Sequence, residues 1–429
     1  MSNLKFSLRK LLAVAAIGAI IGAYLHAKSE DEASVRLEAL TKLTKTLSTV
    51  EKYYVDDIKF KELIDKTIAG LMQNLDAHSS FLNEKAFKDM QVQTNGEFGG
   101  LGITIGMKDS AITVISPIED KAGIKAGDII LRIDGNSTIG MTIDDAVSKM
   151  RGKPKTPITV TILRKGEQKP FDVKIIRDII KVESVYAKMI ENENILYLRI
   201  TNFDKNVASK AREFIKKYSK ADGIILDLRN NPGGLLDQAV KLVDMFVDNG
   251  VIVSQKGRDA NENSEYKASP SATISKLPLV VLVNGGSASA SEIVSGSLQD
   301  SKRAVVVGEN TFGKGSVQVI LPIDDKEALR LTIARYYLPS GRTIQAVGVV
   351  PDLVVYPGKV PQSEASAFNI KENELKAHLQ SELSKIDVQK DANATSQSDE
   401  KAIITQKKID DDIQLKTAID AIKVLKIKQ

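Results

Sequence analysis

Two continuous apolar runs constrain the fold of this chain more than any other feature. They read GIILDL at residues 223–228 and LPLVVLV at residues 277–283, without the alternation of a strand that faces water. Such runs are typical of parallel strands that helices cover on both faces. Two segments with apolar residues at helical spacing alternate with them, NVASKAREFIKKYSK and LLDQAVKLVDMFV. The alternation predicts a layered α/β core over residues 179–358.

The regions on either side of this core have different patterns. Residues 94–178 contain a glycine-rich start, TNGEFGGLGITIG, then short alternating strands and one helical segment, which predicts a small, partly open barrel. Residues 28–93 carry apolar stripes at helical spacing, which predict helices that pack on each other or across a dimer. Residues 359–429 predict a polar linker and a final helix that docks on the body or on a second subunit.

The first 27 residues predict an export signal or a membrane anchor. Lys5, Arg9 and Lys10 precede the apolar run LLAVAAIGAIIGAYLHA, which occupies residues 11–27. Cleavage after Ala27 and retention as an inner-membrane anchor both remain open. In either case we expect the protein in the bacterial periplasm or cell envelope.

Composition excludes several kinds of chemistry. The chain has no cysteine, which removes disulfides, thiolate metal sites and cysteine nucleophiles. It has 60 basic and 55 acidic residues and only 5% aromatic residues, so nucleic-acid binding has little support. No cluster of carboxylates and imidazoles has ligand spacing, so we expect no metal and no cofactor. The only histidines are His26, His78 and His378, and none lies near a candidate nucleophile in the sequence.

A serine-rich turn and a glycine-flanked lysine are the candidate reactive groups. NGGSASASEI follows the second apolar run, and Ser289 with Glu292 fits a helix capping box, which is a purely structural role. The same turn would also place the Ser289 hydroxyl at the carboxyl edge of the sheet, beside helix amides suited to an oxyanion. Without a histidine, the base would be Lys314 in TFGKGSVQ. Burial would have to lower the lysine pKa from about 10.4 by several units, and a solvated turn lysine is the alternative.

Several blocks together resemble a known family. SASASEI, VGENTFGKGSVQ, LDLRNNPGG and LPSGRTIQAVGVVPDLVV are similar to signature blocks of the carboxy-terminal processing peptidases, also called tail-specific proteases. The resemblance runs in family order from about Tyr54 to Val355. It implies an α+β multidomain fold: an N-terminal helical segment, a PDZ domain, a crotonase/ClpP-like spiral α/β core and a C-terminal helical tail.

The resemblance also implies roles for individual residues. Ser289 would be the nucleophile, Lys314 the general base and Gln318 its support. Main-chain amides of Ala290 and of Gly233 or Gly234 would bind the oxyanion. In the PDZ domain, the substrate's terminal carboxylate would bind the loop formed by Gly100, Leu101, Gly102 and Ile103. Val147 and Met150, on the helix that follows, would line the groove for the tail. Arg151 would couple this domain to the catalytic core.

The implied function is that of a serine endopeptidase with a Ser/Lys dyad. It would cleave envelope proteins recognised by unstructured or apolar C-terminal tails, with the PDZ domain binding the tail and gating activity. An adaptor protein and a homo-oligomer through the terminal helices are the expected partners. Two other classes stay open: an inactive PDZ scaffold or chaperone that holds tails, and an acyl-CoA enzyme with a crotonase-like core.

Overall fold

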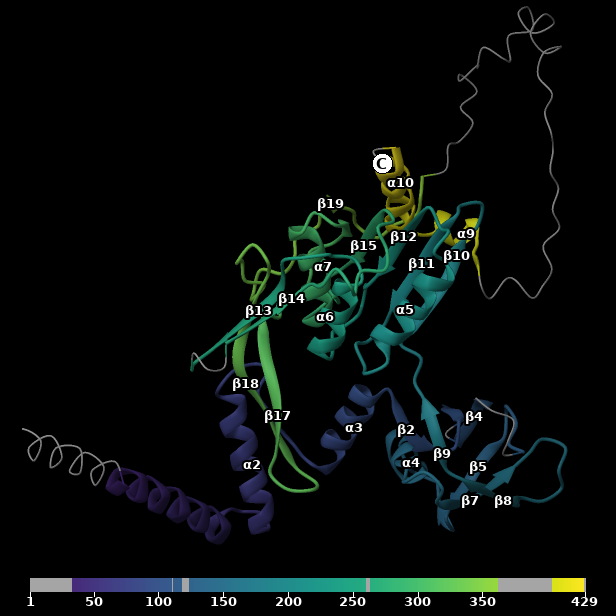
Figure 1. The fold of residues 1–429 in the computed structure, drawn as a ribbon. Coiled ribbons are helices and arrows are strands. Elements are labelled where there is room, and N and C mark those ends of the chain that lie inside the picture. Colours follow the sequence, from purple (N-terminus) through teal and green to yellow (C-terminus); the bar gives the residue numbers. More distant parts are fainter. Residues whose placement is uncertain (1–32, 110, 118–122, 260–262, 362–402, 428–429) are drawn as a thin grey trace, which may run out of the picture. The chain divides into compact units, whose positions relative to one another are not determined.

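The computed structural model describes residues 33–109, 111–117, 123–259, 263–361 and 403–427 (Figure 1). The predicted export segment, His26, His378 and the linker DANATSQSDEK lie outside these ranges. The chain forms two units: the first ends at Phe81 and includes Leu329–Leu331, and the second comprises the rest. Within the described ranges, no helix combines the length and hydrophobicity needed to cross a bilayer.

The first unit is helical. A helix occupies residues 33–53, and α2 (Phe60–Gln73) buries Leu63 and Met72. The chain then turns at Asp76, whose carboxylate accepts the main-chain N–H groups of His78 and Ser79 before β1 (Ser80–Leu82). The stripe predicted on the first helix is largely exposed, with Leu37 67% and Leu40 61% accessible.

A seven-stranded sheet forms the centre of the second unit. Its strand order is β19-β16-β15-β12-β11-β10-β20, and the neighbours from β11 to β19 pair in parallel. Every residue of β12 and β15 is buried, as the two apolar runs predict. The bounds are β10 Val185–Ile190, β11 Ile195–Ile200, β12 Gly223–Asp227, β15 Leu279–Val283, β16 Val305–Gly308, β19 Leu353–Val354 and β20 Ile403–Ile404.

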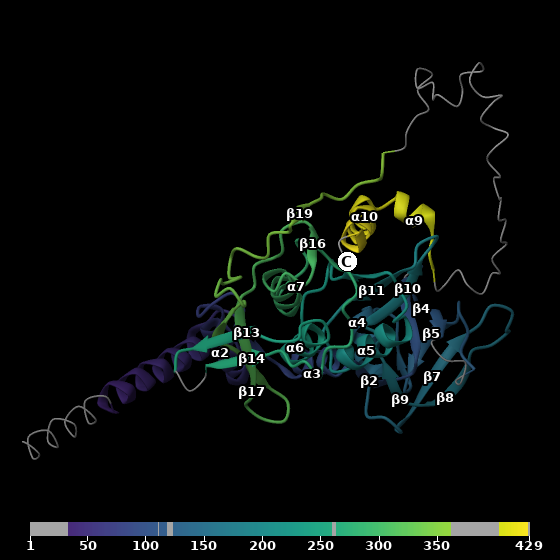
Figure 2. The ribbon, with the colours of Figure 1, turned by 45° about the horizontal axis from the view of Figure 1, so that its top comes forward.

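Helices cover both faces of this sheet (Figure 2). One core cluster joins the sheet to α5 (Val207–Lys217), α6 (Leu236–Asp244) and α7 (Ala290–Asp300). The other cluster joins it to α9 (Gln406–Asp410) and α10 (Ile413–Ile427). The final helix therefore docks on the body of its own chain, one of the two arrangements that its periodicity predicts.

A second sheet lies beside this core. β13 (Val251–Gly257) pairs antiparallel with β14 (Ser264–Lys267) and with β18 (Ala328–Tyr337), and β17 (Ser316–Pro322) pairs with β18. Tyr336 donates its main-chain N–H to the carbonyl of Gly315 at 2.8 Å. This bond fixes the loop that carries Lys314 at the start of β17.

The small barrel predicted from the sequence is a PDZ fold. α3 (Glu84–Asn95) leads into it, and α4 (Ile143–Met150) begins with a reciprocal capping box between Thr142 and Asp145. Its core is a single apolar cluster, and buried Asp128 pairs with Arg164 at 2.8 Å. The strands are β2 Glu97–Gly100, β3 Ile103–Lys108, β4 Ala111–Pro117, β5 Ile129–Ile133, β6 Asn136–Ser137, β7 Pro157–Leu163, β8 Phe171–Ile176 and β9 Asp178–Lys181.

Candidate active site

Ser289 lies in a tight turn between β15 and α7. The strand ends at Val283, and Ser289 immediately precedes the first residue of the helix, Ala290. Its backbone adopts φ +55° and ψ −112°, which non-glycine residues rarely adopt. Strained backbone of this kind persists only where the surrounding contacts enforce it, and it clusters at functional sites. The half-buried side chain is thus held at the carboxyl edge of the sheet.

The buried carboxylate of Glu292 supplies those contacts. It is fully inaccessible to solvent and accepts four hydrogen bonds. Its Oε2 accepts the main-chain N–H of Ser289 at 2.8 Å and that of Lys314 at 2.9 Å. Its Oε1 accepts the N–H of Gly313 and the hydroxyl of Thr311, both at 2.6 Å. One side chain therefore holds the serine turn and the lysine loop together.

The sequence alone gave Glu292 a smaller role. The S-x-x-E pattern predicts a capping box, and the structure contains the bond from Ser289 N–H to the glutamate that this motif requires. What the pattern does not show is that the same carboxylate reaches the loop at residues 311–314. The signal that the sequence offers is one acidic residue in the first turn of the expected helix, between Ser291 and the apolar Ile293.

Two glycines allow the Lys314 loop to pack closely. A Cβ on Gly315 would lie 2.6 Å from the main-chain nitrogen of Gln345, and Gly313 adopts φ +93° beside Ala346. The flanking glycines thus admit the close approach of other backbone that the sequence predicts. The Lys314 side chain is half-buried. Since Ser289 and Lys314 both donate to one oxygen of Glu292, their main-chain nitrogens lie within two hydrogen-bond lengths of each other.

Gln318 lies on β17, next to the lysine loop. Its amide nitrogen donates to Ser316 Oγ at 2.7 Å and to Thr332 Oγ1 at 3.4 Å. Ser316 and Gln318 share one face of the strand, whereas Lys314 precedes the strand, which begins at Ser316.

The turn after β12 meets the serine turn. The carbonyl of Asn231 accepts the N–H of Ala288 at 3.0 Å and the hydroxyl of Ser291 at 2.9 Å. The hydroxyl of Ser287 donates to the carbonyl of Leu228 at 2.8 Å. The serines on either side of Ser289 in the SASAS block therefore tie the two turns together through buried hydrogen bonds.

The glycines of the NPGG turn lie against the serine. A Cβ on Gly233, which has φ +102°, would lie 2.9 Å from Ser289 Cβ and 3.0 Å from the nitrogen of Ala290. Gly233 donates its own N–H to Asn231 Oδ1, and its carbonyl accepts the N–H of Phe203 at 2.9 Å. In a trans peptide the C=O and the following N–H point in opposite directions, so the Gly234 N–H points away from Phe203.

A buried charge network lies at the start of this turn. Asp227 is fully buried and accepts bonds from Arg229 Nη2 and from the hydroxyl of Tyr197, both at 2.6 Å. Burial and the neighbouring Asp227 raise the pKa of Tyr197. Burial alone would lower the pKa of Arg229, but its bonds to Asp227 outweigh this and raise it. Tyr197 is therefore a neutral donor and Arg229 a cation at every physiological pH.

The predicted peptide-binding residues lie in the PDZ domain. Gly102 has φ +66° in the loop Gly100–Ile103, and Leu101 packs in the domain core. Val147 is half-buried on α4, whereas Met150 is only 5% exposed and belongs to the core cluster.

Arg151 ends α4 and contacts the helix that precedes the PDZ domain. Its guanidinium donates to Asp89 on α3 at 3.0 Å and lies 4.6 Å from the ring centre of Phe98. These three residues line a cavity of about 770 Å³ between α3 and α4.

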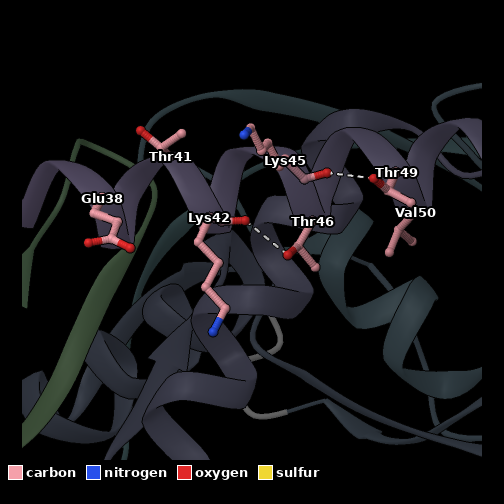
Figure 3. Close-up of a pocket in the computed structure, with 7 residues that line it drawn as sticks. All are labelled: Glu38, Thr41, Lys42, Lys45, Thr46, Thr49 and Val50. Carbon is pink, nitrogen blue, oxygen red and sulfur yellow. Dashed lines mark hydrogen bonds between the residues drawn. The ribbon is translucent and has the colours of Figure 1, made fainter.

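The first unit has a hollow of its own, of about 510 Å³, along the helix at residues 33–53 (Figure 3). The hydroxyls of Thr46 and Thr49 donate to main-chain carbonyls one turn earlier, so they satisfy the helix. None of the predicted site residues lines this hollow. In the parts of the chain that the structure describes, no group of three or more His, Asp or Glu side chains could hold a metal ion.

Comparisons with known proteins match the α/β core and the PDZ domain. A model of peptidase family S41 matches residues 194–355, and a PDZ-domain model matches residues 120–164. The carboxy-terminal-processing protease of Bartonella bacilliformis is 45% identical over 340 residues, covering 77% of this chain and 78% of the relative. The carboxy-terminal processing protease CtpA of Bacillus subtilis is 35% identical over 319 residues, covering 73% and 68%. A solved structure described as a photosystem II D1 C-terminal processing protease is 28% identical, covering 74% of this chain and 93% of that one, with a TM-score of 0.43.

Proposed function

Because the chain belongs to the carboxy-terminal processing proteases of peptidase family S41, we propose that it is a serine endopeptidase with Ser289 as nucleophile and Lys314 as general base. The observation that carries the proposal is the Glu292 carboxylate, which binds the main-chain amides of both residues through one oxygen. Among the chain's residue types, serine with lysine is a combination that supports covalent acyl transfer without cysteine or histidine.

In the proposed acylation step, the neutral amine of Lys314 takes the proton of Ser289 Oγ as this oxygen attacks the scissile carbonyl. The carbonyl oxygen becomes an oxyanion, and the amides of Ala290 and Gly234 stabilise it. Gly234 is favoured over Gly233 because the Gly233 N–H already donates to Asn231. The C–N bond then breaks, and the lysine ammonium gives its proton to the leaving amine.

In deacylation, the same amine takes a proton from the water that attacks the acyl-enzyme. The bond from the acyl carbon to Ser289 Oγ then breaks, the lysine ammonium returns the proton to this oxygen, and the new carboxyl terminus leaves. Gln318 would support the lysine indirectly. Its amide binds the hydroxyls of Ser316 and Thr332, which stabilises the start of β17 next to the Lys314 loop. The backbone conformation of Ser289, φ +55° and ψ −112°, would position the nucleophile at the residue before α7 begins.

The PDZ domain would select the substrate. We propose that the loop Gly100–Ile103 binds the terminal carboxylate of an unstructured, apolar tail, which adds as a strand beside Val147. Arg151 would couple this domain to the preceding helix through Asp89. We further propose location in the bacterial envelope from the basic and apolar residues 1–27, an adaptor protein as a partner, and self-association through the exposed stripe at Leu37 and Leu40.

The alternative function is a scaffold that binds tails without cleaving them. Incubation of the full chain with an unstructured protein that ends in apolar residues separates the two. Wild type should cleave it, and both Ser289→Ala and Lys314→Ala should lower kcat by at least about a thousandfold.

Two control variants test whether these losses are specific. Ser297→Ala removes a buried hydroxyl of α7 that has no hydrogen-bond partner among the described residues, and Lys241→Ala removes an exposed lysine of α6. Both should retain wild-type kcat. Equal turnover by wild type and the two dyad variants would refute the dyad, and binding of the tail without cleavage by wild type would favour the scaffold.

A further inference from the structure

The N-terminus of α10 contacts the turn that carries the proposed oxyanion donors, although the two are distant in the sequence. Nη1 of Arg229 donates to Asp412 at 3.1 Å and to Oε1 of Gln414 at 3.0 Å. The arginine is separated from these residues by 183 and 185 positions. Asp412 immediately precedes α10 and also accepts the main-chain N–H of Leu415 at 3.0 Å, which is the hydrogen bond of a helix N-cap.

The arginine is held on two sides. Nε and Nη2 bind the buried carboxylate of Asp227, the last residue of β12, while Nη1 binds α10. Its side chain is only 13% exposed, so these partners replace most of its hydration. Removing one partner of a buried charged group costs far more than removing one from an exposed pair.

Helix α10 is itself fixed to the sheet. Leu415, Ile419 and Ile422 belong to the same buried cluster as residues of β12, β15 and β16. The side chain of Gln414 is nearly inaccessible and donates to the carbonyl of Val355 at 2.7 Å. Helix α10, which carries Gln414 and follows Asp412 directly, is therefore packed on the strands that carry the site.

The other end of the turn is fixed by the serine helix. Asn231 follows Arg229 by two residues and binds Ala288 and Ser291. Asn230, between them, has φ +56°, a conformation that needs support from its neighbours. The main chain from residue 229 to residue 234 is thus held by α10 at its start and by α7 in its middle.

We propose that Asp412 and Gln414 are positioning residues for the oxyanion turn, and that the C-terminal helix thereby contributes to catalysis. Through Arg229 they set the path of the main chain that leads to Gly233 and Gly234. This inference rests on the proposed function for its effect on catalysis, but the contact and its effect on the turn do not depend on that function.

The test compares two substitutions at opposite ends of α10, in the full chain. Asp412→Ser keeps a side chain that can cap the helix but withdraws the carboxylate from Arg229. Lys426→Ala, the matched control, removes an exposed ion pair with Asp222 at the other end of the helix. The double variant Asp412→Ser/Gln414→Leu removes both acceptors. Hydrogen exchange of peptides spanning residues 228–235 reports on the turn, and steady-state cleavage reports on catalysis.

Asp412→Ser should lower kcat about tenfold, with KM changed less than about twofold, because a misplaced oxyanion donor affects the transition state and not tail binding. Exchange in residues 228–235 should become about tenfold faster. Lys426→Ala should change neither, and the double variant should lower kcat further. If Asp412→Ser and the double variant match Lys426→Ala in kcat and exchange, the proposal is wrong. If wild type does not cleave, the proposed function fails, and the exchange rates alone decide whether α10 holds the turn.

Discussion

Replacing Glu292 with glutamine tests the central contact of the site. The substitution keeps the size of the side chain but turns one of its two acceptor oxygens into a donor. An amide nitrogen in place of Oε2 would face the N–H groups of Ser289 and Lys314, which cannot accept. In place of Oε1 it would face the Thr311 hydroxyl, which can rotate and accept, and the Gly313 N–H, which cannot. The second orientation loses one hydrogen bond and the first loses two, so glutamine should adopt the second.

The expected magnitudes follow from that count. A hydrogen bond to a charged group contributes about 1.5–3 kcal/mol, so the loss of one should lower the free energy of unfolding by about 1.5–3 kcal/mol. A domain that is stable by about 5–15 kcal/mol remains folded after this loss. Because Gly313 immediately precedes Lys314, the freed loop should lower kcat about 10- to 100-fold. Glu292→Leu removes all four bonds, so it should lower both the free energy of unfolding and kcat more than Glu292→Gln does.

The assay combines denaturant unfolding with steady-state cleavage of an unstructured, tailed substrate. Glu213→Gln on α5 is the matched control, since it makes the same substitution at a side chain that is 61% exposed. This control should unfold and cleave like wild type. If Glu292→Gln also unfolds at the wild-type midpoint and keeps kcat within about twofold, the carboxylate does not hold the dyad together.

Two further predictions concern the oxyanion turn and the PDZ domain. Gly233→Ala should lower kcat at least about a hundredfold in the cleavage assay, because its Cβ would lie 2.7 Å from the carbonyl oxygen of Ala288 and would displace the oxyanion turn. Gly250→Ala is the control: Gly250 has a similar φ of +94° but open space around it, so this variant should keep wild-type kcat. Asp128→Asn should destabilise the PDZ domain by about 3 kcal/mol at pH 7, measured by hydrogen exchange of β7 in the full chain. Burial alone would raise the pKa of Asp128, but bonds from Arg164 and Lys125 hold it below its ordinary 3.8. The charged form of Asp128 therefore stabilises the fold above about pH 4. The difference in unfolding free energy between Asp128→Asn and wild type should shrink as the pH falls through the folded pKa of Asp128. A difference that stays constant down to about pH 2 would contradict the argument.

Much of the architecture was predictable because it depends on local pattern. Apolar runs with no polar alternation predicted β12 and β15 as strands buried on both faces, and the structure confirms this. The glycines around Lys314 predicted close approach of other backbone, and Gln345 and Ala346 occupy that position. The periodicity of residues 413–425 predicted a final helix and left its docking surface open.

The sequence by itself determined which segments become strands, helices and glycine turns, since those choices depend on spacing and backbone sterics within a few residues. Only the tertiary structure decided which polar side chains meet across the fold. Glu292 reaches the loop at residues 311–314, and Asp412 reaches Arg229, because the carboxyl ends of neighbouring parallel strands and the helix beneath them converge at one edge of the sheet. A buried carboxylate must find donors wherever the packed chain supplies them, and no local pattern encodes which ones those are.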